Sequence, residues 1–201
     1  MKEGFEKCNY GHTLFIKTSK DSKILIVSLY VDYLIFTGND ELMFAEFKGS
    51  MKHEFDMTDL GRMRYFLGLE VYQRSDGIFI TQKKYALEVL QKFGMDKSNF
   101  VHNPIVPGFK LMKDADGIKV DKTYYKQIIG SLMYLTATRP DMIFAVSLIS
   151  RYMENPTELH LQTAKGVLRY LKETVEFGIF YRKGGDDELV GYTDSDYAGD
   201  L

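Results

Sequence analysis

Residues 24–38 read ILIVSLYVDYLIFTG, and this stretch decides how the first third of the chain folds. Two β-rich runs, 23–30 and 33–37, meet around Asp32. Branched and aromatic side chains at this density favour β-strands. The uninterrupted apolar run 24–27 predicts a strand that is covered on both faces. A third β-rich run at 13–18 lies across a polar turn, so the region is predicted to form a β-sheet.

A helix and a second β section are expected after this sheet. Apolar residues recur at spacings of one or four between positions 42 and 55, which predicts a helix over about 40–54. Asn39 is its expected N-cap. Two further β-rich runs, 64–73 and 78–81, flank Asp76-Gly77, and Asp-Gly between such runs is a strong hairpin signal.

The rest of the chain is predicted to be mainly helical. One helix runs from Thr81, its expected cap, to Phe93, and Gly94 ends it. An irregular stretch follows over 95–120. Three more helical segments, separated by Pro140 and Pro156, are expected over 124–138, 142–153 and 158–173, with Thr157 as the cap of the last. The chain then returns to strand at 177–181 and 188–193.

Composition indicates a globular protein and excludes few functions. The chain has 201 residues, is 45% hydrophobic and carries a net charge of −2. That charge balance does not indicate a nucleic-acid-binding protein, although a local basic groove remains compatible with it. Cys8 is the only cysteine, which excludes an intramolecular disulfide and fits an intracellular setting of unknown compartment. No apolar run approaches the ~18 residues of a membrane span.

Asp32 is the strongest candidate for a catalytic or metal-binding residue. A carboxylate at the tip of two buried strands is held rigidly and faces outward. Phosphoryl transfer with two divalent ions needs several such carboxylates in one cluster, because each ion takes several oxygen ligands. The alternative is ordinary turn chemistry, in which the Asp32 side chain bonds to its own backbone. Spacing alone favours that alternative.

A set of sequence blocks in a fixed order changes this interpretation. They are LYVDYLIFTGN at 29–39, MTDLG at 57–61, YFLGLE at 65–70, TQKKY at 81–85, GSLMYL at 130–135, TRPD at 138–141, LRYLK at 168–172 and GYTDSDYAGD at 191–200. The chain resembles the copia-type retrotransposon reverse transcriptases in these blocks and in their order, over nearly its whole length.

The resemblance implies an α+β fold in three parts. Residues 1–80 would be the end of a reverse-transcriptase palm, an antiparallel sheet with a helix. Residues 81–176 would be a mainly helical thumb and connection. Residues 177–201 would hold the first strands of a truncated RNase H domain.

The resemblance also implies a catalytic site that is incomplete. Asp32 matches the first aspartate of the family's paired motif, which is a Mg²⁺ ligand. The second aspartate falls on Tyr33, and the third lies on an upstream strand that has no counterpart here. Asp194 matches the first metal-binding aspartate of an RNase H, whose other ligands would follow Leu201. Neither incomplete site is expected to bind Mg²⁺ functionally, so the chain is expected to be inactive.

Contacts with an RNA–DNA template–primer are the remaining expectation from the family. The hairpin at 66–70 matches one near the primer terminus, so the backbone at Gly68 is a candidate primer contact. The alternative for this hairpin is packing against a helix, with Gly68 marking a bulge. Lys165, Arg169 and Lys172 share one helix face and are candidate phosphate contacts; the alternative is a face that is simply solvated.

Three hypotheses follow for the chain as a whole. It is a catalytically dead relic of a retrotransposon polymerase, a remnant that still binds nucleic acid, or the lower half of a polymerase that works in two pieces. Tyr33 argues against the third. An unpaired edge of the palm sheet would favour self-association in each case.

Overall fold

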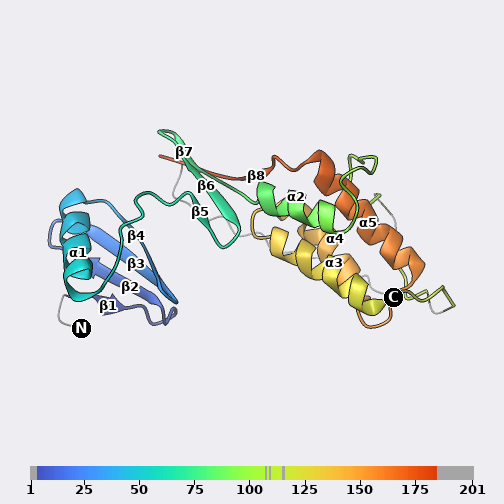
Figure 1. The fold of residues 1–201 in the computed structure, drawn as a ribbon, viewed down its shortest axis with the longest axis horizontal. Coiled ribbons are helices and arrows are strands. Elements are labelled where there is room, and N and C mark those ends of the chain that lie inside the picture. Colours follow the sequence, from blue (N-terminus) through green and yellow to red (C-terminus); the bar gives the residue numbers. More distant parts are fainter. Residues whose placement is uncertain (1–3, 107, 109, 115, 185–201) are drawn as a thin grey trace. The chain divides into compact units, whose positions relative to one another are not determined.

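The computed structural model describes residues 4–106, 108, 110–114 and 116–184. The chain divides into two compact units, Met1–Arg62 and Met63–Leu201, and each is considered by itself. Both are built from antiparallel strands and α-helices (Figure 1). The predicted α+β class is therefore confirmed. No helix in the described part of the chain is long and apolar enough to cross a membrane.

The first unit is a four-stranded meander with one helix against it. Its strands are paired in the order β1-β2-β3-β4 and are followed by helix α1. Their bounds are β1 Glu6–Lys7, β2 Leu14–Thr18, β3 Ile24–Tyr30, β4 Tyr33–Gly38 and α1 Glu41–Glu54. The buried core is formed by Leu25 and Val27 of β3 with Met43 and Phe47 of α1. Ring contacts of Phe36 with Phe44 and Phe47 extend it.

Two predictions for this unit are wrong in detail. The run 24–27 is not buried on both faces: Leu25 and Val27 are buried, but Ile24 and Ile26 are only half-buried. Successive side chains alternate between the two faces of a strand, and α1 packs on one face only. The N-cap of α1 is Asp40, not Asn39, because Asp40 Oδ1 accepts the N–H of Met43 at 2.9 Å.

Asn39 and Asp40 have different structural roles. Asn39 Oδ1 accepts the N–H of Ile24 at 2.8 Å and so joins the end of β4 to the start of β3. Asp40 also pairs with Lys23 at 2.8 Å. The hydrogen bonds from Lys23 and from the Met43 N–H hold the pKa of Asp40 below its usual value. Asn39 thus stabilises the end of the sheet, and Asp40 stabilises the start of the helix.

The second unit has its own four-stranded sheet, in the order β5-β6-β7-β8. The bounds are β5 Tyr65–Phe66, β6 Leu69–Gln73, β7 Gly77–Thr81 and β8 Gly178–Arg182. The β-rich run 64–73 forms two strands, because a tight turn at Leu67-Gly68 divides it into β5 and β6. The predicted strand at 177–181 is confirmed as β8, and it pairs with β7 across about a hundred residues of sequence. The predicted strand at 188–193 lies outside the described residues.

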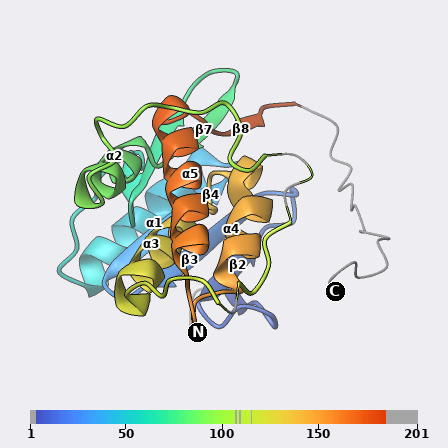
Figure 2. The same ribbon diagram turned by 90° about the vertical axis from the view of Figure 1, so that its right-hand side faces the viewer.

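The helices of this unit enclose its core (Figures 1 and 2). They are α2 Lys83–Lys92, α3 Lys122–Leu135, the 3₁₀ turn η1 Pro140–Met142, α4 Ile143–Ser150 and α5 Glu158–Glu173. The inner faces of α3, α4 and α5 are almost fully buried, with residues such as Ile128, Ile149 and Leu168 at 0% exposure. The helices are interrupted at Pro140 and at Pro156, as predicted.

The helix ends test three further predictions. Gly94 adopts φ +65° just beyond α2, which confirms it as the stop. Thr157 is the N-cap of α5, as predicted, and the structure adds that it forms a capping box with His160. Thr81 is not the cap of α2: the cap position is Gln82, and Thr81 instead donates its hydroxyl to the Phe177 carbonyl at 2.9 Å. That bond ties β7 to the start of β8.

Candidate functional site

The candidate site is the tip of the β3–β4 hairpin. The two strands pair as far as Tyr30 opposite Tyr33, so Val31 and Asp32 alone form the turn. Asp32 is exposed at this tip, as the sequence predicted. Val31 adopts φ +50°, a conformation that is costly for a branched residue. The long paired strands on either side hold this turn in place, so the position of Asp32 is fixed by the sheet.

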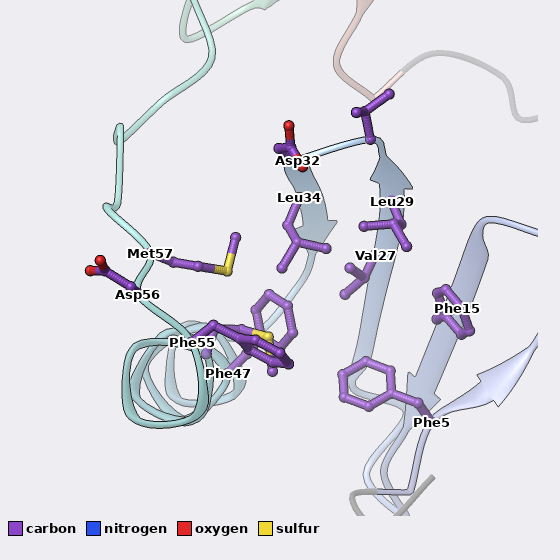
Figure 3. Close-up of a pocket in the computed structure, with 12 residues that line it drawn as sticks. Phe5, Phe15, Val27, Leu29, Asp32, Leu34, Phe47, Phe55, Asp56 and Met57 are labelled. Carbon is purple, nitrogen blue, oxygen red and sulfur yellow. The ribbon is translucent and has the colours of Figure 1, made fainter.

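An apolar groove opens beside Asp32. It has a volume of about 760 Å³ and lies between the hairpin half of the sheet and the end of α1 (Figure 3). Its lining is Phe5, Phe15, Val27, Leu29, Val31, Asp32, Leu34, Phe47, Met51, Phe55, Asp56 and Met57. Sequence reasoning did not find this groove, because no local pattern reveals which part of a sheet face its helix leaves open.

Asp56 is the second carboxylate on the groove, and no sequence pattern singled it out. It follows α1 on the segment that leads out of the first unit, whereas Asp32 sits on the hairpin. Figure 3 shows that the two side chains do not point toward each other. In the described part of the chain, no group of three or more His, Cys, Asp or Glu side chains is placed to hold a metal ion.

The neighbour of Asp32 in the motif is Tyr33. Its side chain is 52% exposed at the first position of β4. A neutral phenol offers a divalent cation one weak oxygen ligand, whereas hard divalent cations prefer carboxylate oxygens. The residues at the tip therefore do not supply the donor set of a two-ion site.

The predicted primer-contact hairpin at 66–70 is a tight two-residue turn. Leu67 has φ +48° and Gly68 φ +75°, the pair of left-handed residues that is typical of a type I′ turn. The idea of a bulge at Gly68 is therefore wrong. Tyr134 of α3 donates its hydroxyl to the Leu67 carbonyl. A Cβ on Gly68 would lie 3.3 Å from the Tyr134 ring, so glycine permits a close approach of this turn to α3.

The three predicted phosphate-contacting residues all lie on α5 and are half-exposed. Lys172 is already engaged, because its Nζ donates to the Ser98 carbonyl at 2.5 Å. Arg169 has its Nε buried without a hydrogen-bond partner among the described residues. Lys165 makes no side-chain hydrogen bond or ion pair with the residues that the structure describes. Asp194, the predicted RNase H ligand, lies outside the described residues.

Comparison with known proteins identifies the family. The sequence model described as "Reverse transcriptase (RNA-dependent DNA polymerase)" matches residues 1–107, which include the Asp32 hairpin and its groove. The chain belongs to the reverse transcriptase family. The predicted resemblance to the copia-type transposon enzymes is confirmed by the relatives that follow.

The relatives are retrotransposon polyproteins and shorter proteins like them. The chain is 36% identical over 197 residues to the retrovirus-related Pol polyprotein from transposon RE1 of Arabidopsis thaliana, covering 98% of this chain and 13% of that protein. It is 35% identical to the corresponding polyprotein from transposon TNT 1-94 of Nicotiana tabacum, covering 94% and 15%. An uncharacterized mitochondrial protein of Arabidopsis thaliana is 34% identical, covering 85% and 71%.

The reverse transcriptase chain described here thus spans 13–15% of the length of the Pol polyproteins that it matches. No solved structure matches it.

Proposed function

We propose that this chain is part of a retrotransposon RNA-directed DNA polymerase and that it does not synthesise DNA on its own. The observation that carries the proposal is Tyr33, which stands beside Asp32 where the resemblance places a second aspartate. In the family, a pair of Mg²⁺ ions supplies activation of the attacking oxygen and stabilisation of the leaving one. Asp32 alone offers too few oxygen ligands for two ions.

The assignment of parts follows the same resemblance. Residues 1–80 are proposed as the end of the palm, 81–176 as a thumb and connection, and 177–201 as the start of an RNase H domain. The helices α2 to α5 within 81–176 support the middle assignment. Asp194 would then be the first RNase H metal ligand.

Primer extension tests the inactivity directly. We expect no incorporation of deoxynucleotides on an RNA template with a DNA primer, with either Mg²⁺ or Mn²⁺. The Tyr33→Asp variant should stay inactive as well, since two neighbouring carboxylates still offer fewer oxygen ligands than two divalent ions need. Addition of the preceding polymerase segment from the transposon RE1 relative should not rescue the parent chain. Incorporation above background by the parent chain in that mixture would contradict the proposal.

A non-catalytic remnant that binds RNA–DNA template–primer is the second candidate function. Lys165 and Arg169 favour it, because they lie four residues apart on one face of α5 and neither is paired with a carboxylate in the described chain. Under this function, filter binding of a hybrid duplex should weaken steeply between low and high salt. Lys165→Ala should reduce the binding, while Lys52→Ala on α1 should not. Negligible binding at low salt would leave only the inactive-polymerase proposal.

Self-association is proposed as a further property of the chain, because strand β4 is an edge of its sheet among the strands that the structure describes.

A further inference from the structure

The outer edge of β4 presents free backbone groups. Leu29 donates its N–H to the Thr13 carbonyl on the β2 side, whereas the Ile24 carbonyl accepts from Asn39 on the β4 side. Backbone groups alternate in direction along an antiparallel strand. In the register that pairs Leu29 with Leu34 and Val27 with Phe36, the backbone groups of Leu34 and Phe36 therefore point away from β3. None of them has a hydrogen-bond partner within the described residues.

The two edges of this sheet differ in their protection against pairing. β1 consists of two charged residues, Glu6–Lys7, and short charged edges discourage the addition of another strand. β4 has six residues and contains no charge, no proline and no bulge. Its side chains are also only half-buried at Leu34, Ile35 and Phe36. β4 is thus the edge of this sheet at which a further strand would be accepted.

We propose that the β4 edge pairs with β4 of a second copy of this chain, antiparallel and with the two-fold axis through Ile35. Leu34 of each copy then lies opposite Phe36 of the other, and the outward groups of these residues form about four backbone hydrogen bonds. Ile35 lies opposite Ile35 of the second copy in a non-hydrogen-bonded pair. The two four-stranded sheets become one sheet of eight strands.

The sequence of β4 suits this self-pairing. A two-fold interface brings the same patch of both copies together, so a strand that enters it must be complementary to itself. In this register Tyr33 lies opposite Thr37, and Asp32 lies opposite Gly38 rather than opposite Asp32 of the second copy. No like charges meet, and aromatic residues face aliphatic or β-branched ones, which are favourable cross-strand pairs. The inference rests on the proposed self-association and adds its strand, its symmetry and its register.

Single cysteines test the register. The experiment uses the full chain with Cys8→Ser, so that the introduced thiol is the only one. Across a non-hydrogen-bonded pair the Cα atoms are about 4.5 Å apart, which a disulfide spans. Ile35→Cys should therefore form a covalent dimer on mild oxidation. In Thr37→Cys the two thiols are offset by about four residues, or roughly 13 Å along the strand, which is too far.

A mixture of Tyr33→Cys and Thr37→Cys should cross-link into a heterodimer more than tenfold faster than Thr37→Cys does alone. Sedimentation of the unmodified chain should show a concentration-dependent dimer, which does not depend on any variant folding. The inference is overturned if the parent chain stays monomeric at all concentrations, or if Ile35→Cys cross-links no faster than Thr37→Cys. Neither result bears on the proposal about the incomplete ion site, because that proposal is tested separately by primer extension.

Discussion

Replacement of Arg139 by methionine is expected to lower the free energy of unfolding of the second unit by about 1–3 kcal/mol, the usual cost of leaving buried hydrogen-bond acceptors without their donor. Arg139 is only 2% exposed. Its Nε and Nη2 donate to the two Asp141 oxygens at 2.9 and 2.7 Å, a bidentate pair. Methionine has a similar length but no donors, so Asp141 would be left without its counter-charge.

Arg139 also joins distant parts of this unit. Its Nη1 donates to the Thr174 carbonyl at 3.0 Å, at the C-terminal end of α5, where a cation is favourable. The guanidinium lies over the rings of Tyr170 and Phe177, at 5.7 and 5.4 Å from their centroids. The turn before α4 is therefore fixed to the end of α5 and the start of β8. These long-range contacts were not predicted from the sequence.

Urea unfolding followed by circular dichroism measures the effect of Arg139→Met. Arg74→Met is the matched control, because Arg74 is exposed and no side-chain contact is seen for it; it should change stability by less than about 0.5 kcal/mol. Equal unfolding midpoints for the two variants would show that the contacts of Arg139 do not contribute to stability.

The ion pair of Arg139 with Asp141 should make the stability of the second unit depend on pH. Burial raises the pKa of Asp141, but the hydrogen bond and charge of Arg139 outweigh this and leave the pKa below its usual value. The carboxylate therefore stabilises the folded state above the unfolded pKa of about 3.9, and this contribution is lost as pH falls through the folded pKa. The stability difference between the parent and Arg139→Met should accordingly shrink between pH 6 and pH 3. A difference that stays constant over this range would assign the effect to packing alone.

Replacement of His160 by alanine is the second large expected effect, a loss of about 3 kcal/mol or more from a cavity together with unsatisfied polar groups. His160 is fully buried and its ring stacks on Tyr152, with centroids 4.1 Å apart. Nδ1 accepts the Thr157 N–H at 2.9 Å, so the ring proton is on Nε2, which lies 2.8 Å from the Met112 carbonyl. The side chain thus caps α5 and anchors residue 112 to it.

Hydrogen exchange and urea unfolding report on this site. In His160→Ala the amide of Thr157 should lose its protection, because the acceptor is gone. Gln162→Ala on the exposed face of the same helix is the control and should stay within about 0.5 kcal/mol of the parent. If His160→Ala is no less stable than Gln162→Ala, the capping contacts carry no stability.

Local signals in the sequence predicted the helices and strands better than the tertiary contacts that these elements make. The helix at Glu41–Glu54 and the stop at Gly94 follow from spacing and from glycine's access to positive φ. The choice between Asn39 and Asp40 as cap depended on the Ile24 amide, which lies fifteen residues away in sequence. The turn at Leu67-Gly68 was predicted by the family resemblance and not by a local signal, because leucine rarely adopts φ +48°. The exposed position of Asp32 was predicted correctly.

The groove beside Asp32 and the pairing of β8 with β7 could not be predicted in the same way. Both depend on which surfaces meet after folding, and no periodicity encodes that. The resemblance to the family supplied the roles of Asp32 and Tyr33, and the structure supplied the paired strands that fix their positions. The functional interpretation therefore depends on how many oxygen ligands this hairpin can offer.

Diffraction from crystals soaked in manganese, recorded at the manganese absorption edge, counts the ions at this hairpin. We predict no pair of neighbouring ion peaks around Asp32. Two peaks about 3.5–4 Å apart, both within coordination distance of the Asp32 hairpin, would be a complete two-ion site and would contradict the proposal that this reverse transcriptase chain is inactive.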